Sequence, residues 1–354
     1  MIKNKYNVIG VMSGTSLDGL DIAYVQFIFN DRWCFKIMAC ETIAYNDSWK
    51  VILNNLVFKS PLELEQTDKE YSLYLAYLIN QFINKNNIIH LDAICSHGHT
   101  ALHRPNVGLT YQIGNQQLLS SQTNHVVICD FRIQDIQFGG QGAPLVPIGD
   151  ELLFPQYDFC INLGGFANIS STSMGIRIAF DICPVNNVLN YYASSLGLNY
   201  DLDGQNAALG QLNDTLLFKL NNLDFYKKEF PKSLGIEWVH EKVIPLIDSC
   251  NLDVKDVLRT YVEHCAIQIT NELNKTDNAS VLVTGGGVYN VFLMRRIKSL
   301  THHQIIIPTK DIIEFKEALV FGLLGLLKLR GENNCLKSVT GAKTDHSSGI
   351  IYKP

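Results

Sequence analysis

The chain has 354 residues, a length typical of two domains and sufficient to bury a large core. Its 29 Lys and Arg residues against 34 Asp and Glu residues give a formal net charge of −5, which argues against nucleic acid or an anionic membrane as the main partner. Hydrophobic residues make up 47% of the chain and charged residues 18%, a balance that excludes a disordered protein.

Nine cysteines are scattered along the chain, and none has the spacing C-x-x-C. Such a distribution is typical of thiols in a reducing compartment and fits neither a disulfide framework nor a zinc knuckle. The apolar run 8–12 is interrupted by Gly10 and is too short for a signal-peptide core, and the apolar stretch 318–329 is shorter than the ~20 residues that cross a bilayer. We therefore expect a soluble, cytoplasmic protein without a membrane partner.

Short β-rich runs alternate with helical patterns along the chain, which predicts an α/β fold. The apolar run 6–12 breaks at a Gly- and Ser-rich turn, 13–19, and resumes at 21–29, so we expect a β-hairpin there. The sequence Thr67-Asp68-Lys69-Glu70 has capping-box spacing and predicts the start of a long helix whose apolar face follows. Strands near 93–96 and 126–129 and a helix near 114–122 complete the first half of the chain.

The segment 139–144 holds the densest Gly and Pro punctuation, so we expect the domain junction near it. Beyond it the opening scheme returns, with strand 159–163, a turn at Gly164-Gly165 and strand 167–172. The remaining predicted elements are helices at 184–196, 206–220, 254–274 and 313–329 and strands at 281–284 and 305–307. Two halves that open alike predict a duplicated fold with a cleft between the halves.

Three glycine-rich turns follow predicted strands, at 13–19, 164–165 and 285–287. Glycine allows main-chain N–H groups to approach an anion closely, and the hydroxyls of the first turn add donors, so we expect a phosphate cradle. Asp18, at the tip of the first turn, is a candidate ligand for Mg²⁺. Any one of these turns could instead merely close a hairpin. The P-loop, dinucleotide-binding and serine-hydrolase motifs are all absent from the sequence.

Asp181 stands just before a predicted helix that Pro184 opens. Its carboxylate could take a proton from a water molecule, or it could cap the helix, and the residues alone leave both possibilities open. His97 and His99 alternate on a strand without a carboxylate or cysteine spaced to complete a zinc site, so we expect them to form hydrogen bonds or to have a structural role. Cys183 is expected to be a small buried side chain.

An ordered series of short motifs resembles the anhydro-N-acetylmuramic acid kinase family of the actin–hexokinase–Hsp70 superfamily, over nearly the whole chain. The motifs are Gly14-Thr15-Ser16-Leu17-Asp18-Gly19, Ser96-His97-Gly98-His99-Thr100, Asp130-Phe131-Arg132, residues 139–147, Asn162-Leu163-Gly164-Gly165 with Ala167-Asn168-Ile169, residues 201–210, Pro231-Lys232-Ser233, residues 285–287 and Thr340-Gly341-Ala342.

The resemblance implies two ribonuclease-H-like lobes of the actin-like ATPase type around a central cleft. We expect residues 1–140, joined by the tail 340–354, to form one lobe and residues 141–339 to form the other. The implied reaction uses ATP and Mg²⁺ to open the 1,6-anhydro ring of anhydro-N-acetylmuramic acid with water and to phosphorylate O6. Its product is N-acetylmuramic acid 6-phosphate, an intermediate of peptidoglycan recycling, and the family also implies a homodimer.

The same resemblance implies roles for individual residues. Asp181 is at the position of the family's catalytic aspartate, and Asp18 would hold Mg²⁺ directly or through water. ATP-binding residues are expected at Ser13, Gly14, Thr15, Ser16, Leu17, Asp18, Gly19, Asn162, Gly164, Gly165, Asn168, Gly285, Gly286 and Gly287. Substrate-binding residues are expected at His97, Thr100, Gln141 and Asn186.

The chain departs from the family pattern in two places. Ile182-Cys183-Pro184-Val185 replaces the usual Thr-Gly-Pro-Gly after Asp181, and Ile236 stands where arginine is usual. These departures leave open a kinase that acts on another amino sugar or a polyol. A nucleotide-gated binding protein without catalysis is a further alternative, which rests on the superfamily alone.

Overall fold

The computed structural model of the protein describes residues 3–14 and 17–354. By compactness the chain divides into unit 1, Met1–Phe154 with Phe315–Pro354, and unit 2, Pro155–Glu314. Unit 1 therefore includes residues 141–154 and 315–339, which the boundaries expected from the sequence assign to the other lobe. The reason is packing, because helices in both of these segments lie against strands of unit 1.

Unit 1 is built on a six-stranded mixed sheet with the order β13-β7-β4-β1-β2-β3. The strands are β1 (Lys5–Ser13), β2 (Gly19–Asn30), β3 (Arg32–Ala44), β4 (Ala93–Ser96), β7 (Val127–Cys129) and β13 (Ile350–Tyr352). Strands β1, β2 and β3 are antiparallel neighbours, whereas β1, β4 and β7 run parallel. A separate two-stranded sheet consists of β5 (His99–Arg104) and β6 (Leu109–Ile113).

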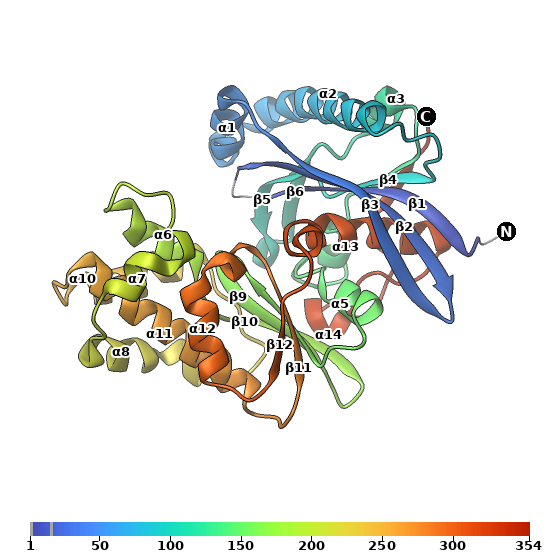
Figure 1. Cartoon of the computed structure of the whole chain (residues 1–354). Helices are drawn as coiled ribbons and strands as arrows, with labels where there is room; N and C mark the ends of the chain where they lie inside the picture. Colours follow the sequence, from blue (N-terminus) through green and yellow to red (C-terminus); the bar gives the residue numbers. More distant parts are fainter. Residues whose placement is uncertain (1–2, 15–16) are drawn as a thin grey trace. The chain divides into compact units, whose positions relative to one another are not determined.

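Two long helices cover opposite faces of this sheet (Figure 1). The alternation of side chains along β1 directs Ile9 and Val11 into the core beneath α2 (Pro61–Lys85), and Val8 and Gly10 toward α13 (Lys310–Arg330). A Cβ atom on Gly10 would lie 1.8 Å from the carbonyl oxygen of Ala318, so only glycine permits this close packing of helix on strand. The remaining helices of unit 1 are α1 (Asp47–Asn54), α3 (Gln117–Thr123), α4 (Ile133–Gln137), α5 (Pro147–Leu153) and α14 (Lys337–Thr340).

Unit 2 is built on a five-stranded mixed sheet with the order β10-β9-β8-β11-β12. The strands are β8 (Phe159–Leu163), β9 (Phe166–Ser173), β10 (Ile176–Pro184), β11 (Ser280–Thr284) and β12 (Gln304–Ile306). The first three are antiparallel neighbours, and β8, β11 and β12 run parallel. The helices are α6 (Asn186–Ser194), α7 (Gln205–Leu209), α8 (Asp214–Asn221), α9 (Ile236–Trp238), α10 (Ile244–Asp248), α11 (Val254–Leu273) and α12 (Val291–Ser299).

The two sheets repeat one topology. Within each unit the first three strands form an antiparallel meander, and two further strands join beside the first strand in parallel, while β13 adds an antiparallel edge strand to unit 1. This repetition confirms the α/β class and the duplication that the opening patterns of the two halves predict. It is also the strand order of the two ribonuclease-H-like lobes that the resemblance implies.

Several elements differ from the sequence predictions. The expected start of α2 at Thr67 is wrong: the helix begins at Pro61, and Ser60 and Glu63 form a capping box about two turns earlier. The helix expected at 206–220 is two helices, because Gly210 lies against the main chain of Lys255 and the chain bends there. Among the helices of the described chain, none is both long and apolar enough to cross a bilayer.

Candidate functional site

The turn between β1 and β2 joins the two strands at the carboxyl end of β1. Leu17 has a φ of 58°, and its N–H donates to the carbonyl of Gly14 at 3.4 Å, which closes the turn. Gly19 starts β2 where a Cβ atom would lie 2.5 Å from the carbonyl oxygen of Ile43, so glycine is required there. Asp18 is exposed at the tip of the turn. The other two predicted ATP-binding residues of this turn, Thr15 and Ser16, lie outside the described residues.

The hydroxyl of Ser13 belongs to a buried network beneath this turn. Ser13 Oγ lies 2.6 Å from the hydroxyl of Tyr45 and 2.7 Å from Nδ1 of His99, and the Tyr45 hydroxyl lies 2.7 Å from that of Tyr71. Burial lowers the pKa of His99 to about 4, so this imidazole is neutral at physiological pH. These buried hydrogen bonds hold the last residue of β1 in place. A phosphate contact by Ser13 would therefore come from its main chain, since its side chain is already engaged.

His97, which directly follows β4, is also buried and neutral. Its Nδ1 lies 2.9 Å from the carbonyl oxygen of Gly98, and its Nε2 accepts a hydrogen bond of 2.9 Å from Nε of Arg132. Burial, together with the neighbouring Arg132 guanidinium, holds the pKa of His97 well below its usual value. Arg132 also donates to the carbonyl of Gly142 at 2.6 Å. His97 thus orients the Arg132 guanidinium, which in turn holds the loop 139–144 through the carbonyl of Gly142.

Two other predicted substrate-binding residues of unit 1 lie on separate elements. Thr100 is half-buried on β5, and Gln112 of β6 donates to its hydroxyl at 3.5 Å, the long limit for a hydrogen bond. Gln141 lies in the loop between α4 and α5, where its N–H donates to the carbonyl of Thr340 at 2.8 Å. Its side chain is exposed and free to contact a ligand.

A carboxylate without a role predicted from the sequence, that of Asp130, lies at the same edge of the unit 1 sheet. Asp130 directly follows β7, as Ser13 ends β1 and His97 follows β4, and the carboxyl ends of parallel strands share one edge. Asp130 has a φ of 61°, and burial, reinforced by Asp68, raises its pKa to about 6. The signal for this residue was present in the sequence: an acidic residue that directly follows a predicted buried strand.

The glycine turn between β8 and β9 in unit 2 is fixed by main-chain hydrogen bonds. The N–H of Val185 donates to the carbonyl of Gly165 at 2.8 Å, and that of Asn186 to the carbonyl of Gly164 at 3.3 Å. A Cβ atom on Gly165 would lie 2.5 Å from Oδ1 of Asn187. The turn therefore packs directly on the first residues of α6, among them the predicted substrate-binding residue Asn186.

The structure brings the third glycine-rich segment to this same turn. Asn162, at the end of β8, pairs with Asn168 of β9 and with Thr284 of β11. Gly285 has a φ of 85°, and a Cβ atom there would lie 2.6 Å from Oδ1 of Asn162, whereas one on Gly286 would meet no atom within 4 Å. The predicted ATP-binding residues of unit 2 thus form one compact group in which the main chain of Gly286 borders open space.

Asp181 lies inside β10 opposite Asn168, at a register shift in the strand pair. Its Oδ2 accepts a hydrogen bond of 2.8 Å from the N–H of Leu234, and its Oδ1 has no hydrogen-bond partner among the described residues. Burial raises the pKa of this carboxyl, and the hydrogen bond from Leu234 partly opposes that rise. The N-cap of α6 is Val185, without a side-chain cap, so the alternative that Asp181 caps this helix is wrong.

The residues that depart from the family pattern after Asp181 belong to the core. Ile182, Cys183 and Val185 are all at most 1% exposed and pack among the buried side chains of unit 2. The carbonyl of Pro184 accepts hydrogen bonds from the hydroxyl of Tyr261 and the thiol of Cys265. The substitutions therefore change internal packing beside Asp181. Cys183 is a small buried side chain, as expected.

Residues 6–354 match the family model described as anhydro-N-acetylmuramic acid kinase. Proteins named anhydro-N-acetylmuramic acid kinase from Mannheimia succiniciproducens and Haemophilus influenzae are 32% and 33% identical to the chain. The alignments cover 99% of this chain and 100% of the first relative, and 97% of this chain and 97% of the second. The protein of that name from Pseudomonas syringae pv. syringae is 34% identical over 97% of this chain and 98% of its own length.

Solved structures also align with the chain. The activator of the 2-hydroxyisocaproyl-CoA dehydratase from Clostridium difficile, with bound ADPNP, aligns with a TM-score of 0.44 and 14% identity, covering 92% of this chain and 96% of that one. A ROK family glucokinase from Streptomyces griseus, in complex with glucose and AMPPNP, aligns with a TM-score of 0.41 and 11% identity, covering 90% and 99%.

Proposed function

The chain belongs to the anhydro-N-acetylmuramic acid kinase family, and from that premise we propose that it phosphorylates anhydro-N-acetylmuramic acid with ATP while water opens the anhydro ring. Water attacks the anomeric carbon, the bond from that carbon to O6 breaks, and O6 takes the γ-phosphoryl group from ATP. ADP leaves, and Asp181 takes the proton of the attacking water. The product is N-acetylmuramic acid 6-phosphate.

The observation that carries this proposal is the state of the Asp181 carboxylate. One oxygen is held by Leu234, and the other has no partner among the described residues, so the side chain is oriented and still able to accept a proton. The raised pKa of this half-buried carboxyl makes its anion a stronger base than an exposed aspartate. Asn168 of β9, one of the predicted ATP-binding residues, lies opposite Asp181 in the strand pair.

The three glycine segments would supply the contacts to ATP. We assign the phosphates to main-chain donors around Gly14, Gly164 and Gly165, and the nucleotide's α-phosphate or ribose to Gly285–Gly287. Phosphoryl transfer depends mainly on positioning and on neutralising charge, for which rigid main-chain N–H groups are suited.

Asp18 would hold Mg²⁺. Mg²⁺ binds through one or two carboxylates and completes its shell with water and phosphate oxygens, so a single exposed carboxylate beside a phosphate turn fits this ion. When bound, Mg²⁺ neutralises charge on the ATP phosphates. His97, Thr100, Gln141 and Asn186 would contact the sugar, with His97 acting through the guanidinium that it orients.

The test is the variant Asp181→Asn, assayed for ADP release with the anhydro sugar. Asparagine keeps an acceptor for the Leu234 N–H but cannot take a proton, so turnover should fall by roughly 10²–10⁴-fold while the fold is retained. Asp224→Asn, which changes an exposed carboxylate of the same unit, is the matched control and should keep wild-type turnover. Wild-type turnover in Asp181→Asn would exclude this residue as the base.

Mass spectrometry of the wild-type product tests the reaction itself. The product should gain the mass of one phosphate group and one water, and in heavy-oxygen water the label should enter at the anomeric carbon. A phosphorylated sugar with the anhydro ring intact would exclude coupled hydrolysis. Faster phosphorylation of N-acetylglucosamine would favour the alternative acceptor instead.

We also propose that the protein forms a homodimer, as the resemblance implies, and that it acts in the cytoplasm. Light scattering coupled to size-exclusion chromatography should give a molar mass of about twice the 39.8 kDa of one chain. A mass of one chain at micromolar concentration would contradict the dimer.

A further inference from the structure

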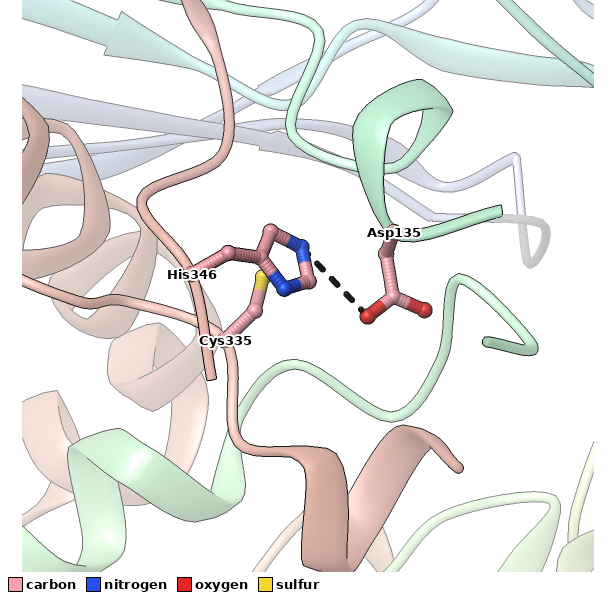
Figure 2. A group of neighbouring side chains, drawn as sticks. All are labelled: Asp135, Cys335 and His346. Atoms are coloured by element: carbon pink, nitrogen blue, oxygen red, sulfur yellow. Dashed lines mark ion pairs between the residues drawn. The ribbon is translucent and has the colours of Figure 1, made fainter. Parts of the chain in front are cut away.

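Three side chains that could bind a metal lie together in the interior of unit 1, and the proposed reaction uses none of them. Asp135 is on α4, Cys335 follows α13, and His346 lies in the C-terminal segment. One ligand atom from each lies within 4.8 Å of the other two, and Figure 2 shows the three side chains pointing toward one another. All three residues are buried, with His346 6% exposed and Cys335 2% exposed.

The hydrogen bonds of His346 define which of its nitrogens faces the cluster. Nδ1 lies 3.0 Å from the carbonyl oxygen of Thr344, which can only accept, so Nδ1 carries a hydrogen. In the neutral ring Nε2 then presents a bare lone pair. This buried atom has no hydrogen-bond partner among the described residues and lies 3.5 Å from Oδ1 of Asp135. Two acceptors that face each other in a buried site repel, so a positive charge is needed between them.

A proton on Nε2 could provide that charge, but two observations favour a metal ion. The separation of 3.5 Å is longer than the ~2.7–2.9 Å of a charge-assisted hydrogen bond. It agrees with a tetrahedral Zn²⁺, whose bonds of ~2.0–2.3 Å place neighbouring ligand atoms roughly 3.3–3.8 Å apart. A proton would also make no use of the Cys335 thiol, whereas nitrogen, oxygen and sulfur together are the ligand types of zinc.

We propose that unit 1 binds one Zn²⁺ through Asp135 Oδ1, Cys335 Sγ and His346 Nε2, with water as the fourth ligand. When the thiol binds, its S–H bond breaks, the proton passes to solvent, and no group is oxidised or reduced. This site is separate from the proposed reaction, since none of its ligands is assigned to ATP, Mg²⁺ or the sugar.

The surroundings of the three ligands are those of a supported metal site. The bond between Nδ1 of His346 and a carbonyl is the contact that fixes the ring of a metal-binding histidine. The Asp135 carboxylate accepts from the Thr340 hydroxyl and from the N–H of Gly142, each at 2.7 Å, so it is held in place. The main chains of Cys335 and His346 are paired by hydrogen bonds of 3.0 and 3.2 Å.

The position of the cluster indicates a structural role. It joins α4, the segment after α13 and the C-terminal segment, which are remote in sequence. The same α4 carboxylate also holds the loop of the predicted substrate-binding residue Gln141 through Gly142. Zinc at this point would fix the C-terminal segment to that loop.

The test measures metal in the full-length protein, purified without a metal-affinity resin, mixed with Zn²⁺ and desalted. We expect about one zinc per chain by mass spectrometry of the metal, and loss of most of it in both Cys335→Ser and His346→Gln. Cys95→Ala and His125→Gln remove a thiol and an imidazole from the same unit, outside the cluster, and should keep the metal. A folded wild-type protein that holds no zinc would overturn the proposal, as would zinc that remains in both cluster variants.

Cobalt substitution identifies the ligands even if a cluster variant is unstable. The wild-type protein loaded with Co²⁺ should show the thiolate-to-metal charge-transfer band of one sulfur ligand and the visible bands of a tetrahedral ion. Chelation should lower the melting temperature of the wild-type protein but not that of His346→Gln. Cobalt bound without the sulfur band, or a histidine resonance showing that His346 Nε2 carries a proton in zinc-treated protein, would overturn the site.

Discussion

The two units place a glycine-containing turn at the same point of the same topology, yet they stabilise it differently. Below the β1–β2 turn the last strand residue is Ser13, whose hydroxyl joins a buried polar network with Tyr45 and His99. At the β8–β9 turn the equivalent residue is Leu163, which packs in the apolar core and against Gly287. The first turn is fixed by side chains, whereas the second is fixed by main-chain hydrogen bonds to α6.

The two turns therefore offer a nucleotide different contacts: the first offers a carboxylate that can bind a cation, and the second offers main-chain N–H groups. The first turn is longer and presents an exposed carboxylate, Asp18, which can act through a cation. The second turn, with Gly285–Gly287 packed on it, offers main-chain N–H groups and the uncharged amides of Asn162 and Asn168. Duplication has therefore preserved the strand order while the chemistry of the two turns has diverged.

The largest effect is expected for Gly285→Ala, in the segment after β11 that packs on the second turn. Gly285 has a φ of 85° and a ψ of 161°, a region that costs a non-glycine residue ~1–3 kcal/mol, and its Cβ atom would lie 2.6 Å from Oδ1 of Asn162. Urea unfolding should show a loss of about 3 kcal/mol or more. Weaker ATP binding should accompany this loss.

Gly286→Ala is the matched control, because a Cβ atom there meets nothing within 4 Å. Its free energy of unfolding should stay within ~0.5 kcal/mol of the wild type. If it nevertheless weakens ATP binding, the main chain of Gly286 faces the nucleotide. Equal destabilisation by both substitutions would contradict the packing described for this segment.

The first turn should respond to Ser13→Ala through its buried network. The substitution leaves Nδ1 of His99 without its buried partner, while the Tyr45 hydroxyl keeps that of Tyr71, and one unsatisfied buried group costs ~1–3 kcal/mol. Thermal melts should show this loss, and Ser48→Ala, which removes an exposed hydroxyl that donates to Asn46, should be nearly neutral. Unchanged stability in Ser13→Ala would mean that the network does not hold the turn.

Local sequence patterns predicted much of the fold, but they did not predict the hydrogen bonds between residues that are remote in sequence. Two apolar runs on either side of a Gly- and Ser-rich turn predicted the hairpin of β1 and β2, whereas the edge strand β3, which has a single buried residue, gave no such signal. Asp181 could be singled out as a carboxylate beside a predicted strand end. The hydrogen bond that it accepts from Leu234 could not be predicted, because the two residues are 53 positions apart and meet only in the folded unit.

The half-buried carboxylates of the two units should differ in their dependence on pH. Asp130 of unit 1 has a pKa raised to about 6 by burial and by Asp68, whereas the Leu234 N–H partly opposes the rise at Asp181. A raised pKa means that the folded state binds the proton more tightly, so the penalty appears as pH rises from about 4 through about 6.

Asp130→Asn should therefore stabilise the protein at neutral pH by roughly 1–3 kcal/mol and have no effect below pH 4, because both states are then protonated. Asparagine tolerates the φ of 61° at this position. Urea unfolding at both pH values measures the difference. A gain of equal size at acidic and neutral pH would contradict titration of Asp130 as its cause.

The smallest effect on stability, but a clear effect on binding, is expected for Asp18→Asn. Asp18 is exposed, so its removal should leave the melting temperature unchanged, while the loss of a charged contact worth ~1.5–3 kcal/mol should raise the KM for ATP with Mg²⁺ by roughly 10-fold or more. Asp31→Asn is the matched control, since Asp31 is an exposed aspartate with positive φ at the other end of β2.

If only the first turn binds the nucleotide through a cation, raising the Mg²⁺ concentration should partly restore ATP binding in Asp18→Asn but should not change ATP binding in Gly286→Ala. Restoration of both variants would show that the two turns share one mode of contact, which would remove the distinction drawn between them.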